Sequence, residues 1–167
     1  KGEPLSVKVY AELLNNLNLN KVTVFDVHSE VTSAVLNNCE VVTNHNFIKQ
    51  VVDTIGKDIV LVSPDGGALK KIYKVSEYLG GIPVIECSKK RNVKNGTLEG
   101  FKVYEDDLKG KTCLIVDDIC DGGGTFLGLA EALKEKNADD LYLAVSHGIF
   151  NKGFKTLNEK FTRIFTT

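Results

Sequence analysis

Short apolar runs rich in β-branched residues alternate along this chain with segments whose apolar residues recur at helical spacing. The expected strands are residues 21–27, 40–43, 58–63, 83–86, 112–118, 141–146 and 163–166. The expected helices are residues 4–19, 29–36, 47–55, 69–79, 125–136 and, more weakly, 151–158. This alternation predicts an α/β fold, a mostly parallel sheet with helices on both faces. Since ligands of such sheets bind beyond the carboxyl ends of the strands, the residues that follow each strand are the first candidates for function.

The composition narrows the function classes. Of the 167 residues 43% are hydrophobic, which allows a real core, and the net charge of −1 argues against a protein that coats nucleic acid. No apolar run approaches the ~20 residues of a membrane span. The four cysteines form no C-x-x-C pair, so neither zinc nor a disulfide framework is indicated, and we expect a reducing cytoplasm. The chain starts at Lys1 and contains no methionine, so we expect a fragment, a processed chain or a trimmed record.

Residues 87–100 interrupt the alternation. They are polar, basic and glycine-containing, without a clear period, and therefore predict a long loop. Lys89 and Arg91 follow an expected strand at the start of this loop. Neighbouring basic residues are ordinarily solvated charge, but this position favours a lid that closes over a ligand and brings the two cations to it.

The strongest signal is the string CLIVDDICDGGGTF, residues 113–126. An apolar strand delivers Asp117 and Asp118 to its carboxyl end, and three glycines and Thr125 open the next helix. Glycines let backbone amides approach a phosphate, and the helix start adds partial positive charge. Carboxylates accept hydrogen bonds from vicinal hydroxyls and can hold hydrated magnesium. We therefore interpret the string as a ribose 5-phosphate site with magnesium; a glycine-rich turn with a solvated acidic rim is the alternative.

This string resembles the loop that binds phosphoribosyl pyrophosphate (PRPP) in type I phosphoribosyltransferases and in ribose-phosphate pyrophosphokinases, the PRPP synthetases. Further segments are similar to the synthetases: FDVHSE (25–30), VSPDGGALKK (62–71), CSKKRN (87–92), GEPLSVKVYAELL (2–14) and VSHGIF (145–150). They occur in the family's order and spacing over nearly the whole chain. The resemblance implies a phosphoribosyltransferase-like, Rossmann-like fold. Residues 1–43 would be the end of a first such domain, and residues 44–167 a second one that carries the ribose 5-phosphate site.

The resemblance also implies roles for individual residues. Ribose 5-phosphate would be bound by Asp117, Asp118, Asp121, Gly122, Gly123, Gly124 and Thr125. ATP and its pyrophosphate would be bound by His28, Asp65, Gly66 and Gly67, and magnesium by His28 and Asp65. Lys89 and Arg91 would be catalytic. Two positions depart from the family pattern, since Gly122 stands where the family has threonine and Ala68 where it has glycine.

The implied function is that of a ribose-phosphate diphosphokinase, which transfers pyrophosphate from ATP to ribose 5-phosphate and yields PRPP and AMP. Its partners would be ATP and ribose 5-phosphate, within a homo-oligomer, and we expect neither nucleic acid nor a membrane as a partner. Two alternatives are a phosphoribosyltransferase that consumes PRPP and a non-catalytic relative that regulates an active partner. Adenine-contacting residues expected upstream are absent from the sequence. We therefore expect this chain by itself to bind ribose 5-phosphate but to make little or no PRPP.

Overall fold

The computed structural model describes residues 5–91 and 98–167, and the chain forms two compact units, Lys1–Asn44 and His45–Thr167. The division falls one residue beyond the expected domain boundary. The first unit contains α1 (Ser6–Asn15), β1 (Val22–Phe25), α2 (Val31–Val35) and β2 (Cys39–Val42), and its two strands pair in parallel. That this unit is the end of a phosphoribosyltransferase-like domain stays a prediction.

The second unit is built on a six-stranded sheet with the strand order β5-β4-β3-β6-β7-β8. Its elements are α3 (His45–Ile55), β3 (Ile59–Ser63), α4 (Leu69–Tyr78), β4 (Val84–Arg91), β5 (Leu98–Val103), β6 (Thr112–Cys120), α5 (Gly124–Glu135), β7 (Leu141–Gly148), α6 (Lys155–Asn158) and β8 (Arg163–Thr166). Only the edge strand β5 is antiparallel to its neighbour within the described part of this sheet. The expected α/β class with a mostly parallel sheet is confirmed.

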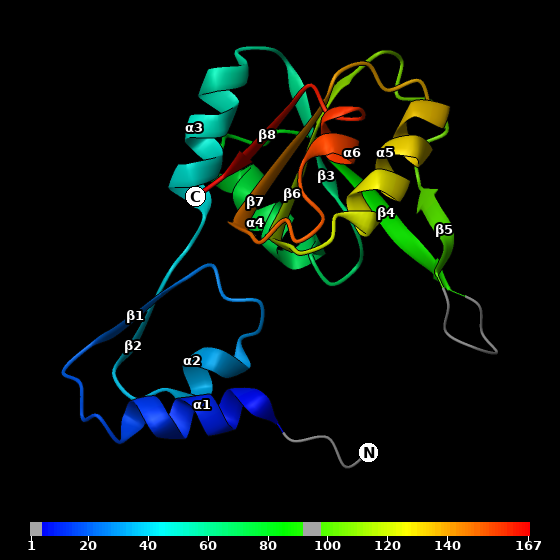
Figure 1. The fold of residues 1–167 in the computed structure, drawn as a ribbon. Coiled ribbons are helices and arrows are strands. Elements are labelled where there is room, and N and C mark those ends of the chain that lie inside the picture. Colours follow the sequence, from blue (N-terminus) through cyan, green and yellow to red (C-terminus); the bar gives the residue numbers. More distant parts are fainter. Residues whose placement is uncertain (1–4, 92–97) are drawn as a thin grey trace. The chain divides into compact units, whose positions relative to one another are not determined.

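Helices cover both faces of this sheet (Figure 1). Because successive side chains of a strand point to opposite faces, β3 and β6 contribute side chains to two separate cores. On one face Val62 packs in a cluster with Phe126 of α5, and on the other Leu61 packs in a cluster with Ile48 of α3 and Ile72 of α4. Burial on both faces explains why these strands are continuous apolar runs rather than alternating ones.

The prediction of a long loop over residues 87–100 is wrong at both ends of that range. β4 continues to Arg91, β5 begins at Leu98, and the two strands pair from Cys87↔Val103 to Arg91↔Leu98. Cys87 and Val103 are buried in the core beneath α5, and Phe101 packs against the same core. The polar residues are tolerated because a strand pair at the edge of a sheet can expose one face to solvent. The intervening residues 92–97 lie outside the described part of the chain, so the lid stays a prediction.

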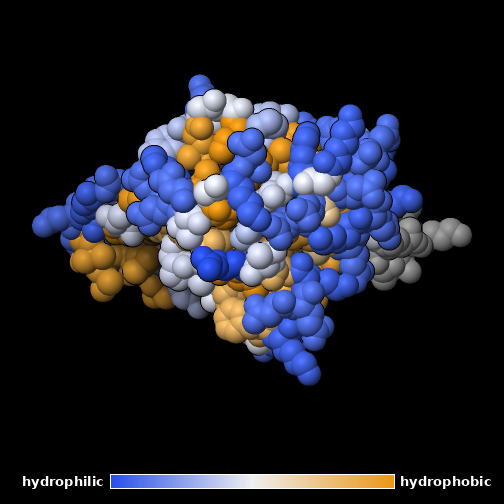
Figure 2. All heavy atoms as spheres, turned by 90° about the horizontal axis from the view of Figure 1, so that it is seen from above, coloured by the Kyte–Doolittle hydropathy of each residue, from blue (hydrophilic) through white to orange (hydrophobic). Residues whose placement is uncertain are grey.

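Figure 2 shows a surface made mostly of hydrophilic residues, with hydrophobic residues gathered in several separate areas. Within residues 5–91 and 98–167, no helix has the length and apolar character that a bilayer crossing requires. Several of the large exposed apolar side chains, among them Val9, Tyr10 and Leu13, lie on α1.

Candidate functional site

The paired aspartates lie within β6, which extends beyond them to Cys120. By the alternation of a strand, Asp118 shares the face of the α4 core and Asp117 the face of the α5 core. Asp118 is nearly buried, with 8% of its side chain exposed, and its Oδ2 lies 3.1 Å from Lys71 Nζ of α4. A carboxylate so far from water needs a cation or donors beside it, and Lys71 supplies the cation.

Asp117 is the most perturbed carboxyl group of the site. Its Oδ1 accepts a hydrogen bond of 2.9 Å from the backbone N–H of Asp118. Burial raises the pKa of Asp117 to about 6, and the charges of Asp118 and Asp65 act in the same direction, while the Asp118 N–H and Lys89 oppose them. A ligand that brings hydroxyl donors or a cation would stabilise the ionised form.

The glycines after β6 lead into α5, and Gly123 is its N-cap. Gly123 has φ 75°, and a Cβ there would lie 3.1 Å from a methyl carbon of Leu157, so both the backbone and the packing require glycine. A Cβ on Gly124 would meet nothing within 4 Å, which leaves room for a ligand above the helix start. The first N–H groups of α5 have no acceptor inside the helix. This end of the helix can therefore bind an anion.

The turn after β3 joins Asp65 to the start of α4. Asp65 Oδ1 accepts hydrogen bonds from the N–H of Gly67 at 2.9 Å and of Ala68 at 3.2 Å. A Cβ on Gly67 would lie 3.1 Å from that same oxygen, whereas a Cβ on Gly66 would meet nothing within 4 Å. Ala68 has φ −79°, so the alanine here causes no backbone strain.

Asp65 also binds the predicted catalytic lysine. Its Oδ2 lies 2.8 Å from Lys89 Nζ of β4. Burial acts to raise the pKa of Asp65, but Lys89 and the two N–H donors outweigh it and hold the pKa below its ordinary value. Because β3 lies between β4 and β6, Asp65 stands between the strand of Lys89 and the strand of Asp117. The structure thus brings the predicted pyrophosphate residue, the predicted catalytic cation and the predicted sugar carboxylates to one edge of the sheet.

The structure gives the positions of the remaining predicted residues but does not test their roles. Asp121 is exposed and Thr125 half-buried, at the two ends of the glycine loop. Arg91 is the last residue of β4. His28 lies between β1 and α2 in the first unit, so a magnesium site shared by His28 and Asp65 stays a prediction.

Two neighbours of the site had no role in the sequence analysis. One is Lys71, which lies inside the quoted segment 62–71 but becomes significant only through its ion pair with Asp118. The other is Lys152, in the loop after β7. A Cβ on Gly122 would lie 3.4 Å from Lys152 Cε. Lys152 falls in the weakly expected helix 151–158, which gave no signal for a role at the site.

Cys120 lies directly before the glycine loop, but burial raises the pKa of its thiol to about 11. A protonated thiol is a poor nucleophile, so this site does not support cysteine chemistry.

A metal ion at this site would be held by only a few protein ligands. In the part of the chain that the structure describes, no three His, Cys, Asp or Glu side chains gather in a way that could hold a metal ion. Magnesium is commonly held by one or two carboxylates together with waters and ligand phosphates. Asp65 and Asp117 supply carboxylate oxygens of that kind, and the raised pKa of Asp117 shows that cationic compensation there is incomplete.

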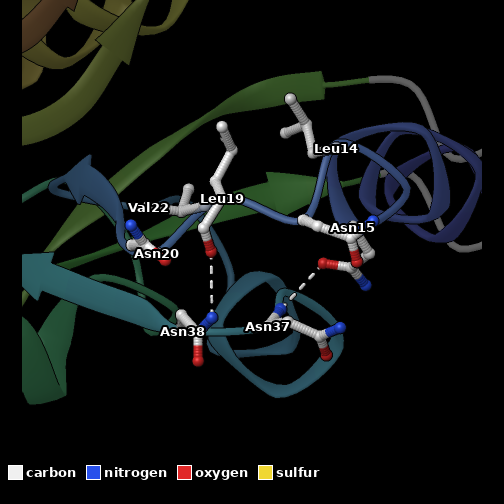
Figure 3. A pocket seen from close by; sticks show the side chains of 8 residues that line it. Leu14, Asn15, Leu19, Asn20, Val22, Asn37 and Asn38 are labelled. Carbon is white, nitrogen blue, oxygen red and sulfur yellow. Dashed lines mark hydrogen bonds between the residues drawn. The ribbon is translucent and has the colours of Figure 1, made fainter.

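The first unit also contains a small hollow (Figure 3). Its volume is about 140 Å³, and it is lined by Leu14, Asn15, Asn18, Leu19, Asn20, Val22, Asn37 and Asn38. Asn15 Oδ1 accepts a hydrogen bond of 2.8 Å from the N–H of Asn37, and Asn38 Nδ2 donates one of 2.9 Å to the carbonyl of Leu19. These amides hold loops together. The hollow is also smaller than the roughly 300–1,000 Å³ of ordinary ligand pockets.

A second hollow, of about 240 Å³, lies in the second unit and is lined by Thr54, Ile55, Tyr142, Thr162, Arg163 and Phe165. It adjoins the starts of β7 and β8, at the end of the sheet opposite to the site. Neither hollow contains a predicted site residue.

Known proteins share sequence and fold with this chain. The family model described as the phosphoribosyl transferase domain matches residues 34–166. The ribose-phosphate pyrophosphokinase of Mycoplasma pneumoniae is 34% identical over 152 residues, which cover 89% of this chain and 45% of the relative. The corresponding protein of Pyrococcus abyssi is 32% identical over 159 residues, covering 92% and 53%.

Among solved structures, phosphoribosylpyrophosphate synthetase from Mycobacterium smegmatis superposes with a TM-score of 0.82 at 27% identity, over 96% of this chain and 52% of that one. The chain spans about half the length of the curated relatives that it matches. Since the family model covers well over half of its residues, the chain belongs to the phosphoribosyl transferase domain family.

Proposed function

We propose that this chain acts as part of a ribose-phosphate diphosphokinase, which converts ATP and ribose 5-phosphate to PRPP and AMP. The observation that carries the proposal is the Asp65–Lys89 ion pair of 2.8 Å beside the strand that carries Asp117 and Asp118. A cation for phosphoryl chemistry and carboxylates for a sugar thereby share one edge of the sheet. The names of the relatives support the same activity.

In this proposal ribose 5-phosphate binds across the end of β6 and the start of α5. The amides from Gly122 to Thr125 receive the phosphate, because helix-start amides and the helix dipole favour an anion. Asp117 and Asp118 accept hydrogen bonds from the sugar hydroxyls. Asp121 completes the acidic side of the loop.

The transfer begins with attack of the anomeric hydroxyl oxygen on the β-phosphorus of ATP. The new O–P bond forms while the bond from that phosphorus to the bridging oxygen of the α-phosphate breaks, AMP leaves with the electron pair, and the hydroxyl proton is released. Lys89 and Arg91 stabilise the charge on the transferring pyrophosphoryl group. When ATP binds, Lys89 therefore leaves Asp65 and contacts the pyrophosphoryl oxygens instead.

Magnesium is the cofactor we propose, with Asp65 as its protein ligand in the second unit; a ligand role for His28 stays a prediction from the resemblance. When bound, the ion neutralises phosphate charge. Asp65 suits this role because its pKa lies below the ordinary value, so the carboxylate is ionised at neutral pH. It is also fixed in place by the Gly67 and Ala68 amides.

We further propose a cytoplasmic homo-oligomer that acts on ATP and ribose 5-phosphate without a nucleic-acid or membrane partner. The four cysteines are free thiols, which suits a reducing compartment. The mass of the native protein, measured by light scattering, tests the oligomer: a monomer at micromolar concentration contradicts it.

A coupled assay for AMP release from ATP and ribose 5-phosphate, run on the native protein rather than on this chain by itself, separates the competing functions. A diphosphokinase releases AMP only when ribose 5-phosphate is present. A phosphoribosyltransferase instead consumes PRPP and releases pyrophosphate when a nucleobase is added. A non-catalytic relative binds ribose 5-phosphate and does neither.

A further inference from the structure

The loop after β7 is attached by backbone hydrogen bonds to the two residues that precede the glycine loop. The N–H groups of Ile149 and Phe150 donate to the carbonyl of Cys120 at 2.9 and 3.1 Å, and the N–H of Asn151 donates to the carbonyl of Asp121 at 3.1 Å. The strands that precede the two loops pair as far as Cys120↔Gly148. The position of Lys152 beside the glycine loop is therefore set by the sheet itself.

A side chain at position 122 would lie in van der Waals contact with Lys152 and close to Asn151. A Cβ on Gly122 would lie 3.4 Å from Cε and 3.5 Å from Cδ of Lys152, and 3.3 Å from Oδ1 of Asn151. The aliphatic part of Lys152 thus covers Gly122, and the ammonium lies one bond beyond Cε. A larger residue at position 122 would have to displace this side chain.

The charges around the site leave Lys152 available for a ligand. Lys71 is paired with Asp118, and Lys89 with Asp65. Lys152 is exposed and forms no ion pair within residues 5–91 and 98–167. A phosphate dianion at the start of α5 would find this ammonium next to Gly122.

We propose that Lys152 binds the phosphate of ribose 5-phosphate, and that Gly122 and Lys152 work as a pair. The inference rests on the proposed function. The ammonium contributes a charge-assisted hydrogen bond from the side of the loop that has no side chain of its own, in addition to the backbone amides. Asn151 holds the same loop in place and leaves the cationic contact to Lys152.

Calorimetric titration with ribose 5-phosphate and, separately, with ribose tests the role of Lys152. Lys152→Ala is expected to weaken ribose 5-phosphate binding roughly tenfold, since an exposed charge-assisted contact is lost, and to leave ribose binding unchanged. Lys152→Arg keeps the charge and is expected to stay within about threefold of the wild type. Lys111→Ala is the matched control, because Lys111 precedes the nine residues of β6 and lies about 30 Å from the loop.

The outcomes separate this inference from the proposed function. If the wild type binds ribose 5-phosphate and Lys152→Ala binds it equally well, or loses affinity for ribose to the same extent, the role of Lys152 is wrong while the ribose site stands. If the wild type does not bind ribose 5-phosphate, both fall.

A double-mutant cycle tests the pairing of the two positions. Gly122→Thr alone should weaken ribose 5-phosphate binding, because the threonine displaces Lys152. In the Lys152→Ala background the same threonine has room, and its hydroxyl can donate to the phosphate, so the double variant should bind more tightly than Lys152→Ala alone. If the double variant instead loses affinity by the product of the two separate losses, the positions act independently and the pairing is refuted.

Discussion

Asp117→Asn should stabilise the protein at neutral pH while it weakens ribose 5-phosphate binding. Burial raises the pKa of Asp117 to about 6 from its ordinary value of 3.8. Between these two values the folded state holds the proton and the unfolded chain does not, so the free energy of unfolding falls as the pH rises. Below the ordinary pKa both states are protonated and there is no penalty. Above about pH 6 the full penalty applies.

The size of the effect follows from the two pKa values. One pKa unit corresponds to ~1.4 kcal/mol, so the upper limit is ~3 kcal/mol. The hydrogen bond from the Asp118 N–H is already included in this upper limit, since it opposes the rise of the pKa, and the amide oxygen introduced by Asp117→Asn would still accept it. The net gain expected for Asp117→Asn is therefore on the order of 1–2 kcal/mol at pH 7.5 and close to zero at pH 4.

Urea unfolding followed by circular dichroism at both pH values measures this gain, since the chain has no tryptophan for fluorescence. Asp121→Asn is the matched control, because Asp121 is exposed and its change should alter stability by less than about 0.5 kcal/mol. Calorimetry on the same preparations should show weaker ribose 5-phosphate binding for Asp117→Asn, since an amide is a poorer acceptor for two hydroxyls. Equal or lower stability of Asp117→Asn at pH 7.5 would refute the assignment of a buried, destabilised carboxylate.

Three further predictions concern the same edge of the sheet. In the catalytically competent native protein, Lys89→Ala and Arg91→Ala should each lower turnover far more than substrate affinity, because their charge is needed mostly in the transition state; normal turnover with raised Michaelis constants would show that they only bind substrate. Gly123→Ala should destabilise the protein by roughly 1–3 kcal/mol in thermal unfolding, because of its positive φ and the contact with Leu157. Gly124→Ala, whose Cβ meets nothing within 4 Å, should cost much less, and equal losses would count against the packing argument. In a thermal-shift titration, a concentration of ribose 5-phosphate that saturates the wild type should raise the melting temperature of the wild type. The same concentration should leave the melting temperature of Asp117→Asn unchanged.

The fold class could be predicted from the sequence because burial on both faces makes β3 and β6 continuous apolar runs. The pairing of strands β4 and β5 could not be predicted from the sequence. In β5 the apolar pattern is short, with Phe101 and Val103 following Gly100, and the polar residues of β4 suggested a loop. The pairing of the two strands is a long-range property that local periodicity does not contain.

The candidate site was predictable as far as its residues follow strands. Lys89 and Asp117 were found in this way, and Asp65 through the resemblance of residues 62–71, but their mutual contacts depend on the strand order β4-β3-β6. The raised pKa of Asp117 is also a tertiary property, because it comes mainly from burial, with a smaller contribution from Asp65, which lies in a distant part of the sequence. Lys152 was missed because the packing of its side chain over Gly122 is a tertiary contact without a local signal.

The fate of a label in the γ-phosphate of ATP tests the central claim most directly. The native protein, rather than this chain by itself, is used in excess over ATP, with magnesium and ribose 5-phosphate, so that even a slow first turnover can be detected. The account predicts labelled PRPP that forms only with ribose 5-phosphate, in amounts equal to AMP, and that is lost in Lys89→Ala. A protein that binds ribose 5-phosphate and ATP but leaves the label in ATP, or releases it only as inorganic phosphate, would contradict the account.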